Sequence, residues 1–201
     1  MKAYHIAQTK QTPVLTDLPI PHPGPGQIRV RIAACGLNFA DLLMIKGQYQ
    51  DTPEPPFTLG MEVAGTVDAL GADVANWQIG DRVADYGGQG GLAEYACYDA
   101  ERCMALPETM DFATAAGFQI AYVTSHLALT HRAQLQPGET FLVLCAAGGV
   151  GDGAEESDAR GAECAGRRGG ERATDDRLGG VVELGSFVGE CEDDGGGFAG
   201  R

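Results

Sequence analysis

Short stretches of alternating apolar and polar residues dominate the first half of the chain. Residues 28–32 read IRVRI, in which isoleucine and valine alternate with arginine at the two-residue period of a half-buried β-strand. The turn-rich PHPGPGQ precedes this stretch. Further strands beside glycine turns are predicted at MEVAGTVDALG (61–71), WQIGDRVADYG (77–87) and GLAEYACYDAERCMALP (91–107). Many short strands with such turns indicate a compact β-barrel or β-sandwich.

The pattern becomes helical after Asp111. Ile120, Val123 and Leu127 follow one another at spacings of three and four, so that one face of a helix is apolar. QPGE (136–139) ends this helix, and FLVLCA (141–146) is a continuous apolar run, typical of a parallel strand that is covered on both faces. The order is therefore a β-rich unit, a helix, and the start of an α/β unit.

The glycine-rich AAGGVG (146–151) has the form of a phosphate turn, which needs a following helix to direct backbone N–H groups at a pyrophosphate. From Gly151 to Arg177 there is no Val, Ile, Leu, Met, Phe, Tyr or Trp. A helix here could bury only alanines and Cys164. Losing about four medium-sized apolar side chains removes roughly 6–12 kcal/mol of burial, comparable with a domain's net stability of about 5–15 kcal/mol. We therefore predict that neither a stable helix nor a second strand follows the turn.

Residues 152–201 differ in composition from everything before them. They contain 13 glycines, 13 acidic residues and six basic residues, all of them arginine. We expect an atypical, low-complexity, disordered tail. Gly, Ala, Arg, Asp and Glu share G- and C-rich codons, so we hypothesise a frameshift near Gly151. A lineage-specific acidic tail is the alternative, and translating the DNA in the other two frames decides between them.

Charge and cysteine usage exclude several classes of protein. The net charge of −14 argues against a nucleic-acid or anionic-membrane partner, because phosphates would be repelled. No apolar run reaches the length of a membrane span, and MKAYHIAQTK lacks the apolar segment of a signal peptide, so we expect a cytoplasmic protein. The six cysteines form no CxxC motif and have no ligand spacing with the four histidines, so no metal site is predicted.

Seven motifs occur in a recognisable order within residues 1–151: PGPGQIRVRIAACGLNFADLLMIKGQY, LGMEVAGTV, IGDRVADYG, GLAEYA, ALPETMDFATAA, LQPGETFLVL and AAGGVG. Together they resemble the zinc-independent quinone oxidoreductase branch of the medium-chain dehydrogenase/reductase superfamily. The resemblance implies an α+β fold leading into α/β. A GroES-like β-rich catalytic domain would span residues 1–122, and the start of a Rossmann NADP-binding domain residues 123–151. The tail at 152–201 does not match, which would leave the Rossmann domain incomplete.

Two places in the sequence indicate the zinc-independent branch of the superfamily. Zinc-dependent alcohol dehydrogenases of the superfamily have a cysteine where this chain has Asn38, and a His-Glu pair where it has Met61 and Glu62. Asn38 and Met61 cannot supply the thiolate and imidazole that bind Zn²⁺. Without zinc, we expect Glu62 to have a structural role.

The resemblance also implies a chemistry and its catalytic residues. NADPH would transfer a hydride to a quinone or to an α,β-unsaturated carbonyl, with the protein supplying orientation and a polar environment. Asn38, Asp41 and Tyr49 would line the cleft, and Tyr49 could donate a proton to the developing oxyanion. As alternatives, Asn38 and Asp41 merely cap the helix suggested by FADLLMI, and Tyr49 is a surface-loop aromatic.

The cofactor would be NADPH. The residues implied for it are Thr124, near the nicotinamide, and Ala147, Gly148, Gly149, Val150 and Gly151 in the phosphate turn. Thr124 could instead bond back to its own helix. A dinucleotide-binding fold places an acidic residue, or an arginine for NADP, about 20 residues past the turn, and Arg167, Arg168, Glu171 and Arg172 fall in that range. Because no strand is predicted to precede these residues, we interpret them as solvated charges.

These inferences lead to one function and two alternatives. The chain is expected to be a truncated NADPH-dependent quinone or enone oxidoreductase with impaired activity and little affinity for the dinucleotide. The first alternative is an enoyl-thioester reductase of the same fold. The second is a non-catalytic GroES-like binding or association module, in which apolar surface around FLVLCA would favour homo-oligomers.

Overall fold

The structure, a computed structural model, describes residues 1–143, 148–156 and 163–166. Ala147 of the predicted phosphate turn and the tail at 167–201 lie outside the described residues. The chain divides into two compact units, Met1–Ile120 and Ala121–Arg201. The division falls inside a helix, and the functional domains inferred from the sequence remain a prediction.

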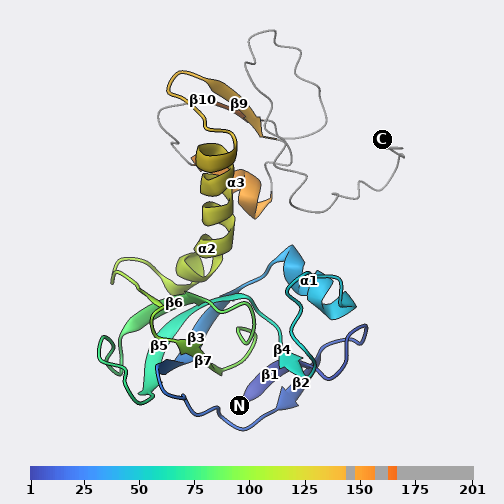
Figure 1. The fold of residues 1–201 in the computed structure, drawn as a ribbon, viewed down its shortest axis with the longest axis vertical. Helices are drawn as coiled ribbons and strands as arrows, with labels where there is room; N and C mark the ends of the chain where they lie inside the picture. The colour runs from blue at the N-terminus through green and yellow to red at the C-terminus, as the bar shows by residue number, and fades with distance from the viewer. Residues whose placement is uncertain (144–147, 157–162, 167–201) are drawn as a thin grey trace. The chain divides into compact units, whose positions relative to one another are not determined.

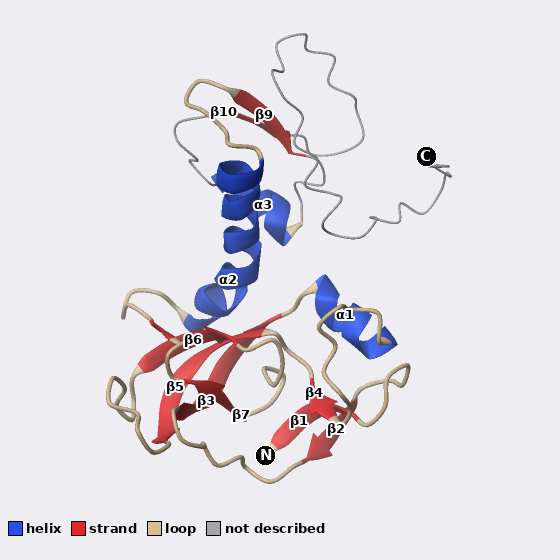
Figure 2. Ribbon diagram, viewed as in Figure 1, coloured by secondary structure: helices blue, strands red, loops and turns tan. Residues whose placement is uncertain are grey.

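A five-stranded antiparallel sheet forms the centre of the first unit (Figures 1 and 2). Alternation along IRVRI places Ile28 and Val30 in the core, as the sequence predicts. Register shifts occur between Arg29 and Val30 and again between Ile32 and Ala34, and such bulges bend and twist a sheet. Its strands, in the order β7-β3-β5-β6-β8, are β7 (Tyr95–Asp99), β3 (Gln27–Gly36), β5 (Glu62–Leu70), β6 (Arg82–Tyr86) and β8 (Met104–Ala105).

A smaller antiparallel sheet and a helix complete the first unit. The strands are β2 (Val14–Asp17), β1 (Lys2–Ile6) and β4 (Phe57–Thr58), in that order. Helix α1 (Phe39–Lys46) ends at Gly47, whose φ of 65° is the left-handed conformation that favours glycine at a helix end. Met44 of α1 is buried with Ile6, Phe57, Leu59 and Met61 in one apolar cluster, which fixes the helix beside the small sheet.

The interior of the large sheet holds the main apolar core of the first unit. Trp77, the single tryptophan of the chain, packs there with Ile28, Val63, Val83 and Tyr98. The indole N–H of Trp77 donates to the carbonyl of Ala100 at 3.0 Å, so the one polar atom of this side chain is satisfied inside the core.

Helix α2 (Phe112–Leu127) passes from the first unit into the second and continues as the π-helical turn η1 (Ala128–Arg132). Strand β9 (Thr140–Val143) and strand β10 (Glu163–Gly166) pair in parallel, with helix α3 (Gly149–Glu156) between them in the sequence. This is the strand–helix–strand order of an α/β unit. Its buried apolar residues are Leu129, Leu135, Phe141, Val143 and Ala154.

The prediction that no helix and no strand follow the glycine turn was therefore wrong for residues 149–156 and 163–166. Small residues, rather than large apolar ones, pack α3. Gly153 approaches α2 so closely that a Cβ there would lie 3.2 Å from the Ser125 Oγ and 3.5 Å from the Ala121 carbonyl oxygen. Ala154 is fully buried, and the Ser125 hydroxyl donates to the Val150 carbonyl at 2.6 Å. A search for large side chains could not detect this kind of packing.

The predicted order of a β-rich unit, a helix and the start of an α/β unit is confirmed. Among the residues that the structure describes, no helix combines the length and apolar character needed to cross a membrane.

Candidate active site

Asp41 anchors the start of α1 with both of its carboxylate oxygens. The side chain is 5% exposed; Oδ2 accepts the Asn38 backbone N–H at 2.9 Å, and Oδ1 accepts the Gly60 N–H at 3.0 Å. Burial raises the pKa of Asp41, and these two hydrogen bonds partly offset the rise. The side chain therefore fixes the helix start to the loop before β5, the capping role that the sequence left open.

Glu62 links three parts of the first unit. It is 2% exposed on β5; its Oε1 accepts the side-chain amide N–H of Asn38 at 2.9 Å, and its Oε2 accepts the backbone N–H of Ile120 in α2 at 2.9 Å. Gly36 leaves room for this arrangement, because a Cβ there would lie 2.4 Å from Oε1 of Glu62 and 2.6 Å from the Ala116 carbonyl oxygen. Glu62 thus holds Asn38 in place, in line with the structural role expected from the sequence.

Tyr49 is half-buried beside the apolar cluster of Met44 and Phe57, just beyond the C-terminus of α1. It lies close enough to Tyr86, which is 39% exposed at the end of β6, to affect the pKa of that phenol. Burial is the largest cause that raises the pKa of Tyr86 to about 12, and the charge and hydrogen bond of Tyr49 add to it.

The pairing of β5 with β6 brings these groups together. Glu62 and Tyr86 are direct partners in that ladder, and side chains directly opposite each other lie on the same face of a sheet. The Asn38–Asp41–Glu62 network and the Tyr49–Tyr86 pair therefore meet at one end of the β5–β6 ladder. Sequence reasoning missed Tyr86, because no motif marks it and only the strand register places it opposite Glu62.

The set of groups at this site is suited to donating hydrogen bonds rather than to binding a metal. An amide and two phenols are its donors, and its two carboxylates are occupied by N–H groups. Within the described ranges, no three His, Cys, Asp or Glu side chains are arranged to hold a metal ion. Neutral donors of this kind can stabilise an oxyanion as negative charge develops on it.

The predicted cofactor residues lie in the second unit. Thr124 is half-buried on α2, and both roles considered for it from the sequence remain predictions. Gly148 and Gly149 are exposed where α3 begins, Val150 is half-buried, and Gly151 is buried. Exposed glycines at a helix N-terminus leave backbone N–H groups accessible to phosphate oxygens, so this segment fits a pyrophosphate.

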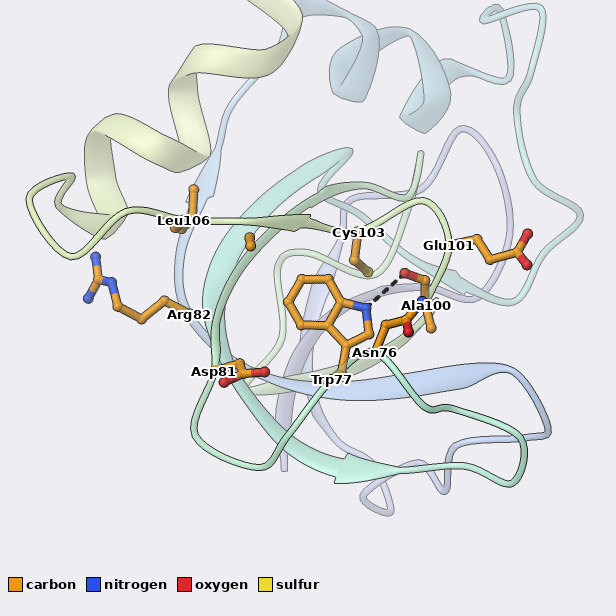
Figure 3. Close-up of a pocket in the computed structure, with 9 residues that line it drawn as sticks. Asn76, Trp77, Asp81, Arg82, Ala100, Glu101, Cys103 and Leu106 are labelled. Atoms are coloured by element: carbon orange, nitrogen blue, oxygen red, sulfur yellow. Dashed lines mark hydrogen bonds between the residues drawn. The ribbon is translucent and has the colours of Figure 1, made fainter.

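Two hollows of about 510 Å³ each lie elsewhere on the first unit and share Trp77, Asn76, Ala100 and Glu101 in their walls. Figure 3 shows the first, with the hydrogen bond from Trp77 to Ala100 at its base. Its arginine, Arg82, donates to the Met110 carbonyl and lies 4.0 Å from the centre of the Phe112 ring, while its Nε has no hydrogen-bond partner among the described residues. Neither hollow contains a residue of the predicted site.

Comparisons with known proteins agree with this arrangement. Residues 24–108 match the alcohol dehydrogenase GroES-like domain. Over 128 residues the chain is 45% identical to quinone oxidoreductase-like protein 2 of Rattus norvegicus, a match that covers 64% of this chain and 37% of the rat protein.

Two solved structures resemble the chain in fold. The quinone oxidoreductase from Thermus thermophilus, also solved in complex with NADPH, superimposes with a TM-score of 0.73 at 38% identity and covers 83% of this chain and 52% of that one. The CurK enoyl reductase superimposes with a TM-score of 0.73 at 30% identity and covers 82% and 53%. The chain thus spans about half the length of these structures and less of the rat relative.

The matched domain, these relatives and the fold agree with the motifs quoted from the sequence. Over the residues matched, the chain is similar to quinone oxidoreductase-like proteins of the medium-chain dehydrogenase/reductase superfamily.

Proposed function

We propose that the first unit carries the substrate side of an NADPH-dependent reduction of quinones or α,β-unsaturated carbonyls. The observation that carries the proposal is the Tyr49–Tyr86 phenol pair beside the Asn38–Glu62 hydrogen bond. An electron-poor carbonyl that accepts two electrons develops negative charge on oxygen, and this site offers hydrogen-bond donors without a metal. When bound, the nicotinamide supplies the hydride.

Tyr49 is the proposed proton donor. In the proposed arrangement the Tyr86 hydroxyl donates to the Tyr49 oxygen, which leaves the Tyr49 proton for a substrate oxygen. Transfer of that proton leaves Tyr49 as a phenolate, which the Tyr86 hydroxyl stabilises by the same hydrogen bond. Asp41 and Glu62 act as positioning residues, since their oxygens already accept N–H groups of the protein.

The second unit would hold the cofactor through Gly148, Gly149, Val150 and Gly151, with Thr124 as a further candidate and Ala147 outside the described residues. The strand missing from the sequence prediction is present as β10, and Arg167 follows it directly in the sequence. A strand therefore does precede these arginines in the sequence. Arg167, Arg168 and Arg172 themselves lie outside the described residues.

We propose that this chain binds NADPH only weakly, because the residues beyond β10 do not resemble the rest of a Rossmann domain. Titration of the full chain into NADPH, followed by the cofactor's fluorescence, measures the affinity directly. A dissociation constant in the millimolar range is the expected result, and micromolar binding would contradict the proposal.

Activity is tested by following NADPH oxidation at 340 nm with 1,4-benzoquinone, at a cofactor concentration high enough for weak binding. Tyr49→Phe is expected to lower the rate about 100-fold, within the range that general acid catalysis contributes. Tyr4→Phe is the matched control, since Tyr4 is an exposed tyrosine on β1. Equal rates for the two variants would exclude Tyr49 as the donor, and no turnover above the uncatalysed rate would contradict the proposed activity of the chain.

An enoyl-thioester reductase is the second candidate, favoured by the similarity to an enoyl reductase and by the same phenol donor. Parallel assays with benzoquinone and with a crotonyl thioester distinguish the two. Preference for the thioester would assign the site to enoyl reduction.

A non-catalytic association module is the third candidate. Val123 and Leu127 on α2 are 61% and 48% exposed. Exposed apolar side chains favour self-association. Light scattering that gives the monomer mass at high concentration would argue against this candidate.

A further inference from the structure

A cavity of about 160 Å³ lies between β6 and β7 in the first unit, apart from the residues assigned to catalysis. Its walls include Asp85 of β6, Tyr98 and Asp99 of β7, and Arg102 of the turn that follows. The cavity is smaller than the roughly 300–1,000 Å³ of pockets that hold drug-sized ligands, so it fits an ion or a molecule of few atoms.

Asp85 is a buried carboxyl group that the backbone hydrogen bond from Tyr86 and the charge of Arg102 compensate only in part. The side chain is 2% exposed, and its Oδ1 has no hydrogen-bond partner among the residues that the structure describes. The ion pairs of the described chain join Lys2 to Asp17 and Arg29 to Asp68, so Asp85 belongs to neither. An unpaired buried polar group is rare in folded proteins and calls for an explanation.

Tyr98 provides a second unpartnered group on the same wall. It is 6% exposed, and within the described part of the chain its hydroxyl makes no hydrogen bond. Gly87 lets these side chains pack closely against the backbone, because a Cβ there would lie 2.3 Å from Cε1 of Tyr98 and 3.0 Å from Oδ2 of Asp85. Asp85 and Tyr98, each with one unpartnered polar atom, thus both line one small cavity.

The charges around the cavity favour a cation. Asp85 and Asp99 contribute two negative charges, and Arg102 contributes one positive charge. The Arg102 guanidinium donates to the carbonyl of Tyr86, and its charge offsets part of the negative charge of Asp85. The excess negative charge of this wall is therefore left for a ligand to neutralise.

The number of acceptors bears on the nature of the cation. A metal ion needs several oxygen, nitrogen or sulfur ligands close together. The described residues contain no group of three such side chains arranged for a metal. A primary ammonium ion instead carries three N–H donors that can reach separate acceptors one at a time.

We propose that the cavity between β6 and β7 binds a small organic ammonium ion, whose N–H groups donate to Asp85 and to the Tyr98 oxygen. Binding is electrostatic and hydrogen-bonded, and it requires the ionised carboxylate. Burial raises the pKa of Asp85 to about 6, with Arg102 opposing the rise and Asp99 adding to it. Only about a tenth of Asp85 is therefore ionised at pH 5, and affinity should fall about tenfold between pH 8 and pH 5.

The test is an NMR titration of the ¹⁵N-labelled full chain with methylammonium chloride at constant ionic strength. Saturable shifts are expected at the amides of 85–87 and 98–102 at pH 8, with about tenfold weaker binding at pH 5. Tetramethylammonium chloride is the matched probe, because it has the same charge and no N–H donor. Asp85→Asn should abolish saturation, whereas Glu108→Gln, which alters an exposed carboxylate outside the cavity, should leave it unchanged.

Three results would overturn the proposal. Equal shifts with tetramethylammonium would mean that charge alone attracts the ion. Saturation retained in Asp85→Asn would place the binding elsewhere. Absence of saturable shifts up to the solubility limit would mean that the cavity holds water, which commonly satisfies polar cavities of this size.

Discussion

Asp85 should destabilise the folded chain at neutral pH, and its replacement by asparagine should reveal by how much. The carboxyl group lies almost completely buried on β6, where burial raises its pKa from 3.8 to about 6. A pKa that is higher in the folded state than in the unfolded state means that the folded protein holds the proton more tightly. Ionisation of Asp85 therefore opposes folding.

The sign and size of the effect follow from these two pKa values. Below pH 3.8 the group is protonated in both states and has no effect. Between about pH 4 and pH 6 the unfolded chain ionises first, so the free energy of unfolding falls as the pH rises. Above pH 6 the full penalty applies, and a difference of about two pKa units corresponds to roughly 3 kcal/mol.

Asp85→Asn has nearly the same shape and does not titrate. The variant should be more stable than the parent by up to about 3 kcal/mol at pH 7.5 and by less than about 1 kcal/mol at pH 4. Urea unfolding followed by the fluorescence of Trp77 measures this, because the single tryptophan packs in the same core cluster as the neighbouring Tyr98. Glu108→Gln serves as the control for a general change in net charge.

Two outcomes would refute the reasoning. If Asp85→Asn were equally stabilising at both pH values, packing or hydrogen bonding rather than ionisation would explain the change. If the variant were less stable at pH 7.5, the backbone hydrogen bond from Tyr86 and the charge of Arg102 would outweigh the cost of burying the carboxylate. The same substitution is predicted to remove ammonium binding, so stability and binding should change in opposite directions.

The remaining predictions concern the candidate active site and helix α2. Glu62→Ala should lower the free energy of unfolding by roughly 2–4 kcal/mol, because two buried donors lose their acceptor, and urea titration at pH 7.5 measures the loss. Gly36→Ala should unfold at a lower temperature in calorimetry, since its Cβ would lie 2.4 Å from the Glu62 carboxylate. Gly117→Ala, with open space around it in α2, should instead gain about 1 kcal/mol. Tyr49→Phe should lower the pKa of Tyr86 from about 12, because the substitution removes the Tyr49 hydroxyl, and an ultraviolet titration of the tyrosines measures the change. An unchanged titration curve would mean that Tyr49 does not affect the ionisation of Tyr86.

The strands of the first unit could be predicted from the sequence because each shows its own local pattern. The alternation in IRVRI places Ile28 and Val30 inside, and the helix start at Asn38 follows from its residue types. Tyr86 and Asp85 could not be found in this way. The importance of each depends on which strand lies opposite it, and strand register involves residues far apart in the sequence.

Helix α3 was missed for a different reason. The sequence argument counted large apolar side chains, and the segment after the glycine turn has none. Gly153 and Ala154 pack differently, because their small side chains allow the backbone of α3 to approach α2 closely. Such backbone contacts depend on the relative geometry of two helices, and the hydrophobic pattern of the sequence does not reveal them.

The hydrogen bond from Ile120 to Glu62 has a practical consequence for dividing the chain into fragments. Ile120 is the last residue of the first unit, so the donor that satisfies a buried carboxylate of β5 comes from the very edge of that unit. A fragment that stopped a few residues earlier, at the end of the barrel strands, would leave one oxygen of Glu62 buried without a partner. Recombinant versions of the β-rich unit should therefore extend through Leu127, so that the helix retains the turns that hold this N–H in position.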